Sequence, residues 1–166
     1  LLEQDITELD FDVTNLDCIL CGCDGFNYIT YDEDLEGVFT KCHELLKENG
    51  IFIFDISSYY KLSTVLGNNM YGENRENVAY MWQNYFDDYE NLVEMDLAFF
   101  VKGEDGRFDK FEENHLQRAY KNEEIIEYLK ILSPKFPEWL LDYIYTPEMI
   151  RLDGIGMSCG TLYTKV

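Results

Sequence analysis

Hydrophobic and polar residues alternate with a helical period between Asp32 and Gly50. Apolar side chains recur three and four residues apart, as in a helix with one buried face. These apolar residues are Leu35, Val38, Phe39, Cys42, Leu45 and Leu46. Gly50 is placed to end the helix as a left-handed residue. The run Ile51–Phe54 is apolar throughout, which favours a parallel strand covered on both faces. The pattern predicts one helix–strand unit of an α/β sheet, with ligands near Asp55 at the carboxyl end of the strand.

Two further elements flank this unit. The apolar segment Leu16–Cys23 predicts a second parallel strand, followed by a polar turn that contains glycine. After the strand Ile51–Phe54, the segment Ser57–Leu66 predicts a short helix that Ser57 or Ser58 caps and Gly67 ends.

From Val78 onward the hydrophobic period becomes two, which is typical of strands with one buried face. The three strands predicted by this period are Val78–Phe86, Leu92–Val101 and Phe108–Tyr120. The dipeptide Asp105-Gly106 favours a tight hairpin between the last two. The preceding segment, Asn69–Asn77, is polar and predicts a loop. The region therefore predicts an antiparallel meander added to the α/β layer.

Helical spacing returns over Asn122–Leu132. Two later segments, Leu140–Tyr145 and Met157–Val166, are candidates for closing antiparallel strands. No internal repeat or linker divides the sequence, so one domain with an insertion is preferred to two domains.

Four landmarks follow one another in a fixed order: QDI, a strand ending in CDGFNYI, an amphipathic helix, and the run ENGIFIFDISSYYKL. In this order they resemble class I S-adenosylmethionine-dependent methyltransferases. The likeness is closest to small bacterial members with a β-rich insertion after the fifth strand, and it covers Leu1 to about Lys130. The resemblance implies the α/β class, with a partial Rossmann-like methyltransferase sheet and an antiparallel β insertion.

Under this resemblance the chain divides into three segments. Residues 1–67 would form the C-terminal part of the cofactor-binding α/β core, and residues 68–120 an antiparallel insertion that caps the acceptor. Residues 121–166 would supply the return helix and the closing strands. The resemblance also implies an enzyme whose cofactor is S-adenosylmethionine and whose acceptor is a small molecule.

The family opens with a strand, a glycine-rich loop and a second strand whose terminal acid holds the ribose hydroxyls. No such element precedes Leu1–Asp5, which is expected to be the third strand. The chain is therefore expected to be a fragment of the enzyme. The alternative is a non-catalytic interaction module that keeps part of the fold. A sheet that lacks its first strands exposes an apolar edge, so a homodimer is expected if the chain is produced alone.

Composition narrows the choice of partners. The chain has 166 residues, of which 46% are hydrophobic, enough for a genuine core. Its 33 acidic and 13 basic residues give a formal net charge of −20, so a nucleic-acid partner is not expected. No apolar run approaches the ~20 residues that span a bilayer, and the first residues of the sequence do not show a basic segment followed by an apolar one. The expectation is a cytoplasmic protein without a membrane partner.

The cysteines offer a metal hypothesis that the geometry of a strand disfavours. Cys18, Cys21 and Cys23 lie close together, and paired thiolates at such spacing can bind zinc. In a strand, however, Cys18 points to the opposite face from the other two, and no second cysteine pair or histidine pair completes a site. No metal is therefore expected, and the odd number of cysteines suits a reducing compartment.

Two positions are candidates for cofactor binding under the resemblance. Asp5 would accept a hydrogen bond from the adenine amino group, and the backbone amide of Ile6 would meet a ring nitrogen; the alternative for Asp5 is an ordinary turn aspartate. Cys23 and Asp24 end the next strand, where the family places the sulfonium and the methionine amino group. A carboxylate or carbonyl there would complement positive charge. The alternative is that Asp24 only turns the chain with Gly25.

Acceptor recognition involves residues that differ between members of the family. The candidates are Asn27, Tyr28, Tyr59, Tyr60, Trp82, His115 and Arg118. Tyr28 can equally be a lid over the core. His115 could act as general base, because its reference pKa of ~6.5 lies close to working pH. Arg118 could pair with a carboxylate of the substrate. The alternatives are a structural histidine and an ordinary ion pair, and methyl transfer does not require a single catalytic residue.

Overall fold

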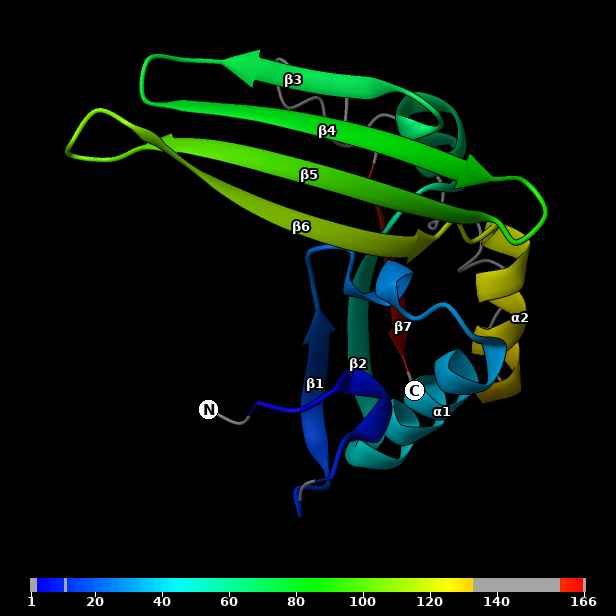
Figure 1. The fold of residues 1–166 in the computed structure, drawn as a ribbon. Coiled ribbons are helices and arrows are strands. Elements are labelled where there is room, and N and C mark those ends of the chain that lie inside the picture. The colour runs from blue at the N-terminus through cyan, green and yellow to red at the C-terminus, as the bar shows by residue number, and fades with distance from the viewer. Residues whose placement is uncertain (1–2, 11, 133–158, 166) are drawn as a thin grey trace. The chain divides into compact units, whose positions relative to one another are not determined.

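The computed structural model describes residues 3–10, 12–132 and 159–165 (Figure 1). The chain forms two compact units. One contains the chain up to Ser58 together with the part from Tyr120 onward and is called here the α/β unit. The other, Tyr59–Ala119, is called the sheet unit. None of the helices in the described ranges is long and apolar enough to cross a bilayer.

The α/β unit is built on a mixed sheet with the strand order β1-β2-β7. Its strands are β1 (Leu16–Cys21), β2 (Leu46–Ser57) and β7 (Cys159–Lys165). Strand β1 pairs with β2 in parallel, and β7 pairs with the other edge of β2 in antiparallel fashion. Its helices are α1 (Asp32–Leu45), α2 (Asn122–Leu132) and the short 3₁₀ helices η1 (Ile6–Glu8) and η2 (Gly25–Tyr28). The mixed sheet confirms the predicted α/β class and the predicted closing strand near the C-terminus.

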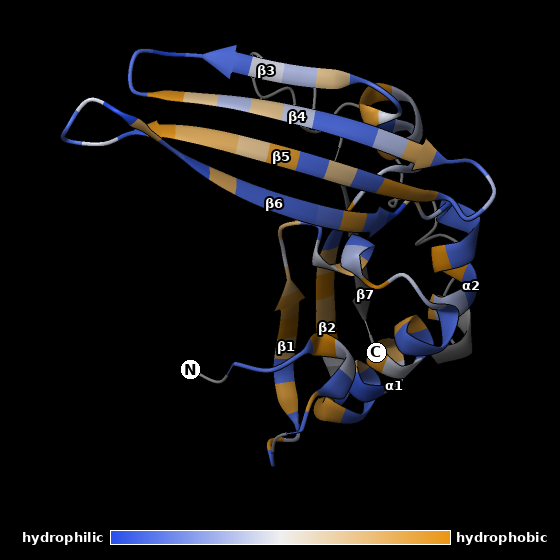
Figure 2. Cartoon of the chain, viewed as in Figure 1, coloured by the Kyte–Doolittle hydropathy of each residue, from blue (hydrophilic) through white to orange (hydrophobic). Residues whose placement is uncertain are grey.

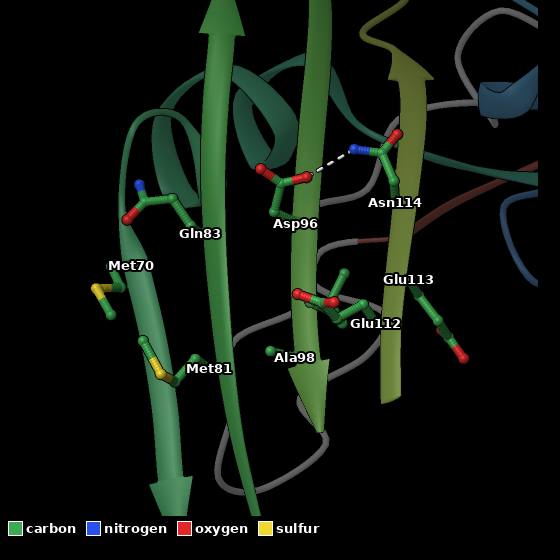
Figure 3. Close-up of a pocket in the computed structure, with 9 residues that line it drawn as sticks. Met70, Met81, Gln83, Asp96, Ala98, Glu112, Glu113 and Asn114 are labelled. Carbon is green, nitrogen blue, oxygen red and sulfur yellow. Dashed lines mark hydrogen bonds between the residues drawn. The ribbon is translucent and has the colours of Figure 1, made fainter. Parts of the chain in front are cut away.

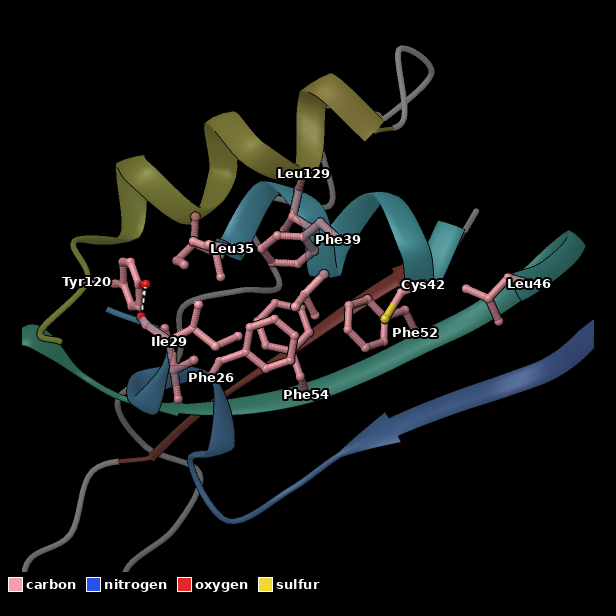
Figure 4. Close-up of a cluster of buried hydrophobic side chains, with 13 residues drawn as sticks. Phe26, Ile29, Leu35, Phe39, Cys42, Leu46, Phe52, Phe54, Tyr120 and Leu129 are labelled. Carbon is pink, nitrogen blue, oxygen red and sulfur yellow. Dashed lines mark hydrogen bonds between the residues drawn. The ribbon is translucent and has the colours of Figure 1, made fainter. Parts of the chain in front are cut away.

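The core of the α/β unit lies between α1 and one face of β2 (Figure 4). Phe39 of α1 and Phe54 of β2 are 1% exposed, and their ring centroids are 5.6 Å apart. Phe26 of η2 lies against both rings and is fully buried. The hydroxyl of Tyr120 donates to the carbonyl of Ile29, which ties the return segment to this core. The helical spacing seen in the sequence therefore marks the buried face of α1 correctly.

Two details of the first helix–strand unit differ from prediction. The helix ends at Leu45, and Gly50 lies inside β2 without a positive φ. A Cβ atom at Gly50 would lie 2.9 Å from the carbonyl oxygen of Lys47, so glycine is required there by close packing. The predicted burial of both faces of Ile51–Phe54 is also wrong. Phe52 and Phe54 face the core, whereas Ile51 is 41% exposed.

Three other expectations have different outcomes. In the strand predicted at Leu1–Asp5, residues 3–5 are not in a strand, because the described part of the sheet offers them no pairing partner; residues 1–2 lie outside the described ranges. Ser57 belongs to β2 and does not cap the next helix. The predicted strand Leu140–Tyr145 also lies outside the described residues, whereas α2 occupies the predicted helix.

The sheet unit is a four-stranded antiparallel meander with the order β3-β4-β5-β6. Its strands are β3 (Met70–Asn74), β4 (Val78–Asp87), β5 (Leu92–Lys102) and β6 (Phe108–Arg118). A short π-helix, η3 (Lys61–Leu66), precedes them and places Leu62 and Leu66 in a small core with Val93, Met95 and Ala119. Figure 2 shows that β5 is rich in hydrophobic residues, whereas β6 is mostly hydrophilic. The three predicted strands of the meander are confirmed as β4, β5 and β6.

The beginning of the sheet unit was not anticipated. Met70–Asn74, predicted as a loop, forms the edge strand β3 and pairs with β4 only. An edge strand with largely exposed side chains needs no hydrophobic alternation, and therefore the sequence carried no signal for it. The helix is also shorter than predicted, although Gly67 ends it with a φ of 42°. Because η3 packs on the sheet, the compact unit starts at Tyr59, whereas the predicted insertion starts at residue 68.

Candidate functional site

The carboxyl end of β1 leads into a turn with an unusual backbone. Cys23 has a φ of 60° and Asp24 a φ of 49°, so two consecutive residues other than glycine are left-handed. Each such residue costs roughly 1 kcal/mol or more relative to an ordinary conformation. The turn is followed directly by η2, which starts at Gly25. Other contacts must therefore hold the backbone of Cys23 and Asp24 in place.

Those contacts come from the end of the neighbouring strand β2. The backbone N–H of Asp24 donates to Oδ2 of Asp55 over 3.1 Å. The hydroxyl of Ser57 donates to Oδ2 of Asp24 over 2.9 Å. The side chain of Asn27 donates to the carbonyl of Ser57 over 3.1 Å and accepts from the N–H of Ser57 over 2.7 Å. Because parallel strands end at the same edge of a sheet, these residues meet where ligands of α/β sheets bind.

The carboxylate of Asp55 is a further feature of this edge. Its Oδ1 is buried and has no hydrogen-bond partner among the described residues. A Cβ atom built on Gly22 would lie 3.8 Å from this oxygen, so the carboxylate lies against the backbone that enters the turn. Burial raises the pKa of the nearby Cys21 thiol, and the charge of Asp55 and the thiol of Cys23 raise it further. The edge therefore presents carboxylates, which complement a cationic group.

Asp5 and Ile6 lie in another part of the α/β unit. Asp5 caps η1, and its Oδ1 accepts hydrogen bonds from the N–H and the hydroxyl of Thr7 over 2.8 and 2.7 Å. These two bonds lower the pKa of the exposed Asp5 carboxyl. Its Oδ2 accepts no hydrogen bond from the described residues. Ile6 packs against the hydrophobic core beside α1. Asp5 thus fills the predicted turn role and still has one oxygen open to a ligand.

The other candidates of the α/β unit follow the turn. Cys23 is exposed, as is Tyr28 at 47%. Asn27 is fully buried, and its amide is engaged with Ser57. Asp24 and Asn27 are therefore brought together by their shared partner at the end of β2. The amide of Asn27 supports the turn, and its predicted contact with an acceptor stays a prediction.

The aromatic candidates of the sheet unit have different surroundings. The hydroxyl of Tyr59 donates to Asn91, and its ring meets Phe86 edge-on. Tyr60 is 63% exposed just before η3. Trp82 packs against the ring of Tyr71, and its indole nitrogen is buried without a hydrogen-bond partner among the described residues. Tyr60 is thus the most accessible of the three.

His115 and Arg118 belong to the same strand but face opposite sides of the sheet. His115 is opposite Met95 and Arg118 is opposite Leu92, and side chains alternate along β6. Nε2 of His115 lies 3.2 Å from Oε2 of Glu113. The two cationic candidates therefore cannot serve a single ligand on one face of the sheet.

A pocket that the sequence did not predict lies on one face of the sheet unit (Figure 3). Its volume is about 480 Å³. Its lining residues are Met70, Met81, Gln83, Asp96, Leu97, Ala98, Glu112, Glu113 and Asn114. The amide of Asn114 donates to Asp96 over 2.6 Å and to Glu94 over 3.1 Å. None of the predicted site residues lines this pocket, because it is formed by cross-strand neighbours whose register a sequence does not reveal.

Among the described residues, no group of three or more His, Cys, Asp or Glu side chains could hold a metal ion. Cys18, Cys21, Cys23 and Cys42 are free thiols. Sequence reasoning missed two residues of the sheet edge, Asp55 and Ser57, as partners of the turn. The position of Asp55 directly after an apolar run was the available signal, since ligands and polar contacts gather where parallel strands end.

The chain is similar to known proteins over most of its length, although no family model matches it. It is 32% identical over 127 residues to a protein of Geobacillus sp. (strain WCH70) named "Putative methyltransferase GWCH70_2453". It is 33% identical over 130 residues to "Putative methyltransferase YqeM" of Bacillus subtilis (strain 168). These matches cover 76% and 78% of the chain but 51% and 52% of the relatives. The chain spans about half the length of the curated relatives it matches.

A solved structure extends this likeness to the fold. The crystal structure of an S-adenosylmethionine-dependent methyltransferase from Clostridium acetobutylicum ATCC 824 is 38% identical to the chain, with a TM-score of 0.79. The match covers 98% of this chain and 63% of that chain. The resemblance predicted from the sequence is therefore confirmed.

Proposed function

From the likeness of the chain to class I S-adenosylmethionine-dependent methyltransferases in fold and sequence, we propose that its protein transfers a methyl group to a small-molecule acceptor. The observation that carries the proposal is the 38% identity with the enzyme from Clostridium acetobutylicum, whose name states its cofactor dependence. S-adenosylmethionine supplies a methyl group on a positively charged sulfur. The residues of the chain bind the cofactor, orient it toward the acceptor and exclude water.

The chemistry of Asp5 fits one end of this cofactor. Oδ1 of Asp5 is held by Thr7, which leaves Oδ2 to accept a hydrogen bond from the adenine amino group. The lowered pKa of Asp5 keeps the carboxylate ionised, and an ionised carboxylate is a pure acceptor. The backbone N–H of the neighbouring Ile6 would meet a ring nitrogen.

The turn after β1 fits the other end. Cys23 and Asp24 lie at the edge of the sheet where the carboxylates of Asp24 and Asp55 meet the turn. Such groups stabilise a sulfonium and an ammonium through charge. These residues therefore suit a cationic ligand and would repel an anionic one.

The acceptor would be recognised by exposed residues of the turn and by the sheet unit, which we propose to cap it. Tyr28 and Tyr60 are accessible and aromatic. His115 is the candidate base for removing a proton from an amine, hydroxyl or thiol acceptor, because histidine is the most frequent general base and this ring lies beside Glu113. Arg118 faces the other side of β6 and is the alternative to His115: it would pair with a carboxylate of an acceptor bound on that face.

Isothermal titration of S-adenosylhomocysteine and S-adenosylmethionine into the complete protein tests the cofactor assignment. We expect micromolar dissociation constants. Asp5→Ala should weaken binding at least about tenfold, because the variant loses a hydrogen bond to a charged acceptor. Asp10→Ala is the matched control, since Asp10 is an exposed acid of the same segment. The absence of binding by the complete protein would contradict the proposal and favour a non-catalytic interaction module.

A further inference from the structure

We propose that Asp55 is a positioning residue that presets the backbone of the Cys23–Asp24 turn for the cofactor without touching it. The inference rests on the proposed function, because it assigns that turn to the sulfonium and methionine end of S-adenosylmethionine. It adds Asp55 and Ser57 to the residues on which cofactor binding depends.

The first step of the argument is that the turn is costly. Both Cys23 and Asp24 are left-handed, with φ values of 60° and 49°, and neither is glycine. Local sequence preference therefore opposes this conformation at two consecutive residues. A free turn would relax to other backbone states, and the carbonyl and carboxylate groups would no longer point in fixed directions.

The second step is that β2 supplies the restraint. The side chain of Asp55 accepts the N–H of Asp24 itself, the second of the two left-handed residues. Hydrogen bonds to a carboxylate are stronger than those between neutral groups. Ser57 holds the side chain of the same residue, and the fully buried Asn27 fixes the backbone of Ser57. Strand β2 thus restrains Asp24 twice: Asp55 holds its backbone and Ser57 holds its side chain.

The third step separates Asp55 from a residue that serves stability alone. It lies at the ligand-binding edge of the sheet, and its Oδ1 is buried without a partner among the described residues. Burying an unpartnered carboxylate oxygen is unfavourable, so an apolar residue would stabilise the fold at least as well. An aspartate at this position is explained by the turn that it holds.

Asp17 offers a matched control within the same sheet. It is also an aspartate on a strand, but it lies in β1 near the amino end and is exposed, paired with Lys47. Replacing it removes a carboxylate from the sheet without removing a restraint on the turn.

The experiment is a titration of S-adenosylhomocysteine into the complete protein and four variants, with thermal unfolding measured in parallel. Asp55→Ala should raise the dissociation constant at least tenfold. Asp55→Asn should stay within about threefold of the wild type, because its amide oxygen still accepts the N–H of Asp24. Ser57→Ala should give an intermediate loss, and Asp17→Ala should leave the dissociation constant unchanged.

Exchange of the Asp24 amide proton, followed by NMR, provides a readout that does not depend on the cofactor. Asp55→Ala should speed this exchange, and Asp55→Asn should restore its protection. If Asp55→Ala binds S-adenosylhomocysteine as tightly as the wild type, the inference is overturned. If Asp55→Ala does not fold, unchanged binding by Ser57→Ala overturns it instead. Failure of the wild type itself to bind overturns the proposed function, and with it this inference.

Discussion

The two units of the chain bury their hydrophobic residues in different ways. In the α/β unit, aromatic side chains from η2, α1 and β2 form a closed cluster that includes Phe26, Phe39 and Phe54. In the sheet unit, the small core with Val93 and Leu62 occupies one part of one face. Phe111, farther along the sheet, is 55% exposed. The first unit depends on packing between separate segments, and the second on pairing between strands that are consecutive in the chain.

This difference teaches where each unit is vulnerable. Loss of one aromatic ring from a closed cluster leaves a cavity that neighbouring segments cannot fill. Exposed side chains on an antiparallel sheet can be replaced while the backbone ladder remains. The buried thiol of Cys42 reports selectively on the α/β unit, since burial and, to a smaller extent, the nearby Cys21 raise its pKa to about 12. The two units should therefore respond separately to substitution.

The largest expected effect is that of Phe39→Ala. Its ring contacts those of Phe26, Phe52, Phe54 and Tyr128. The free energy of unfolding of the α/β unit should fall by about 3–5 kcal/mol. Alkylation of Cys42 at pH 8, followed by mass spectrometry, should accelerate as the population of the open unit rises, because the thiol reacts when the unit opens. Phe111→Ala should cost below ~1 kcal/mol, and an equal loss would contradict the comparison.

A smaller effect is expected from Leu62→Ala in the sheet unit. Leu62 is fully buried and joins η3 to the sheet. The expected loss is about 2–3 kcal/mol, in the lower part of the range for this substitution, because neighbouring Trp82 and Leu97 are only partly buried. Hydrogen exchange measured by mass spectrometry should increase in β4 and β5. Accelerated alkylation of Cys42 in this variant would show that the units do not open separately.

Two glycines separate steric from conformational requirements. Gly50→Ala should destabilise the α/β unit by about 1–3 kcal/mol through overpacking, since its Cβ would crowd two backbone carbonyl oxygens. Gly106 has a φ of 80° and open space around it, so Gly106→Ala should cost about 1 kcal/mol. Asn tolerates left-handed geometry. In urea denaturation, Gly106→Asn should therefore be more stable than Gly106→Ala, whereas Gly50→Asn should be less stable than Gly50→Ala. If asparagine is better than alanine at both sites, or worse at both, this assignment is refuted.

The smallest effect is expected at the ion pair of Asp17 with Lys47, both of which are substantially exposed. The hydrogen bond and the charge of Lys47 lower the pKa of Asp17 from 3.8. The contribution of Asp17 to stability is therefore present above pH ~3.8 and is lost as the pH falls through its lower folded pKa. In Lys47→Ala, an NMR titration should find the pKa of Asp17 shifted back up. An unchanged pKa would exclude the pair in solution.

The fold could largely be predicted where burial leaves a periodic pattern. The helical spacing through Phe39 marked α1, and the period of two marked β4, β5 and β6. Two kinds of element escaped. Strand β3 is an exposed edge with a polar sequence. The end of α1 was misplaced because Gly50 serves close packing, which depends on contacts that only the folded chain makes.

The candidate site was predicted in part for a similar reason. Asp24 was identified because it was predicted to end a strand; β1 ends earlier, at Cys21, and Asp24 lies in the turn that follows, with polar partners. Its partners Asp55 and Ser57 come from more than thirty residues away, and pairing at that separation depends on the register of β1 and β2. A single sequence gives no information on that register.

Trp82 gives the sheet unit an optical signal of its own. Its indole nitrogen is buried without a hydrogen-bond partner among the described residues, and the ring packs against Tyr71. Fluorescence from a partly buried indole lies at shorter wavelength than that from an indole fully exposed to water. The sequence holds one other tryptophan, Trp139. In a Trp139→Phe protein, the emission maximum of Trp82 would therefore reveal whether an acceptor, an additive or a substitution has exposed this part of the sheet unit to water.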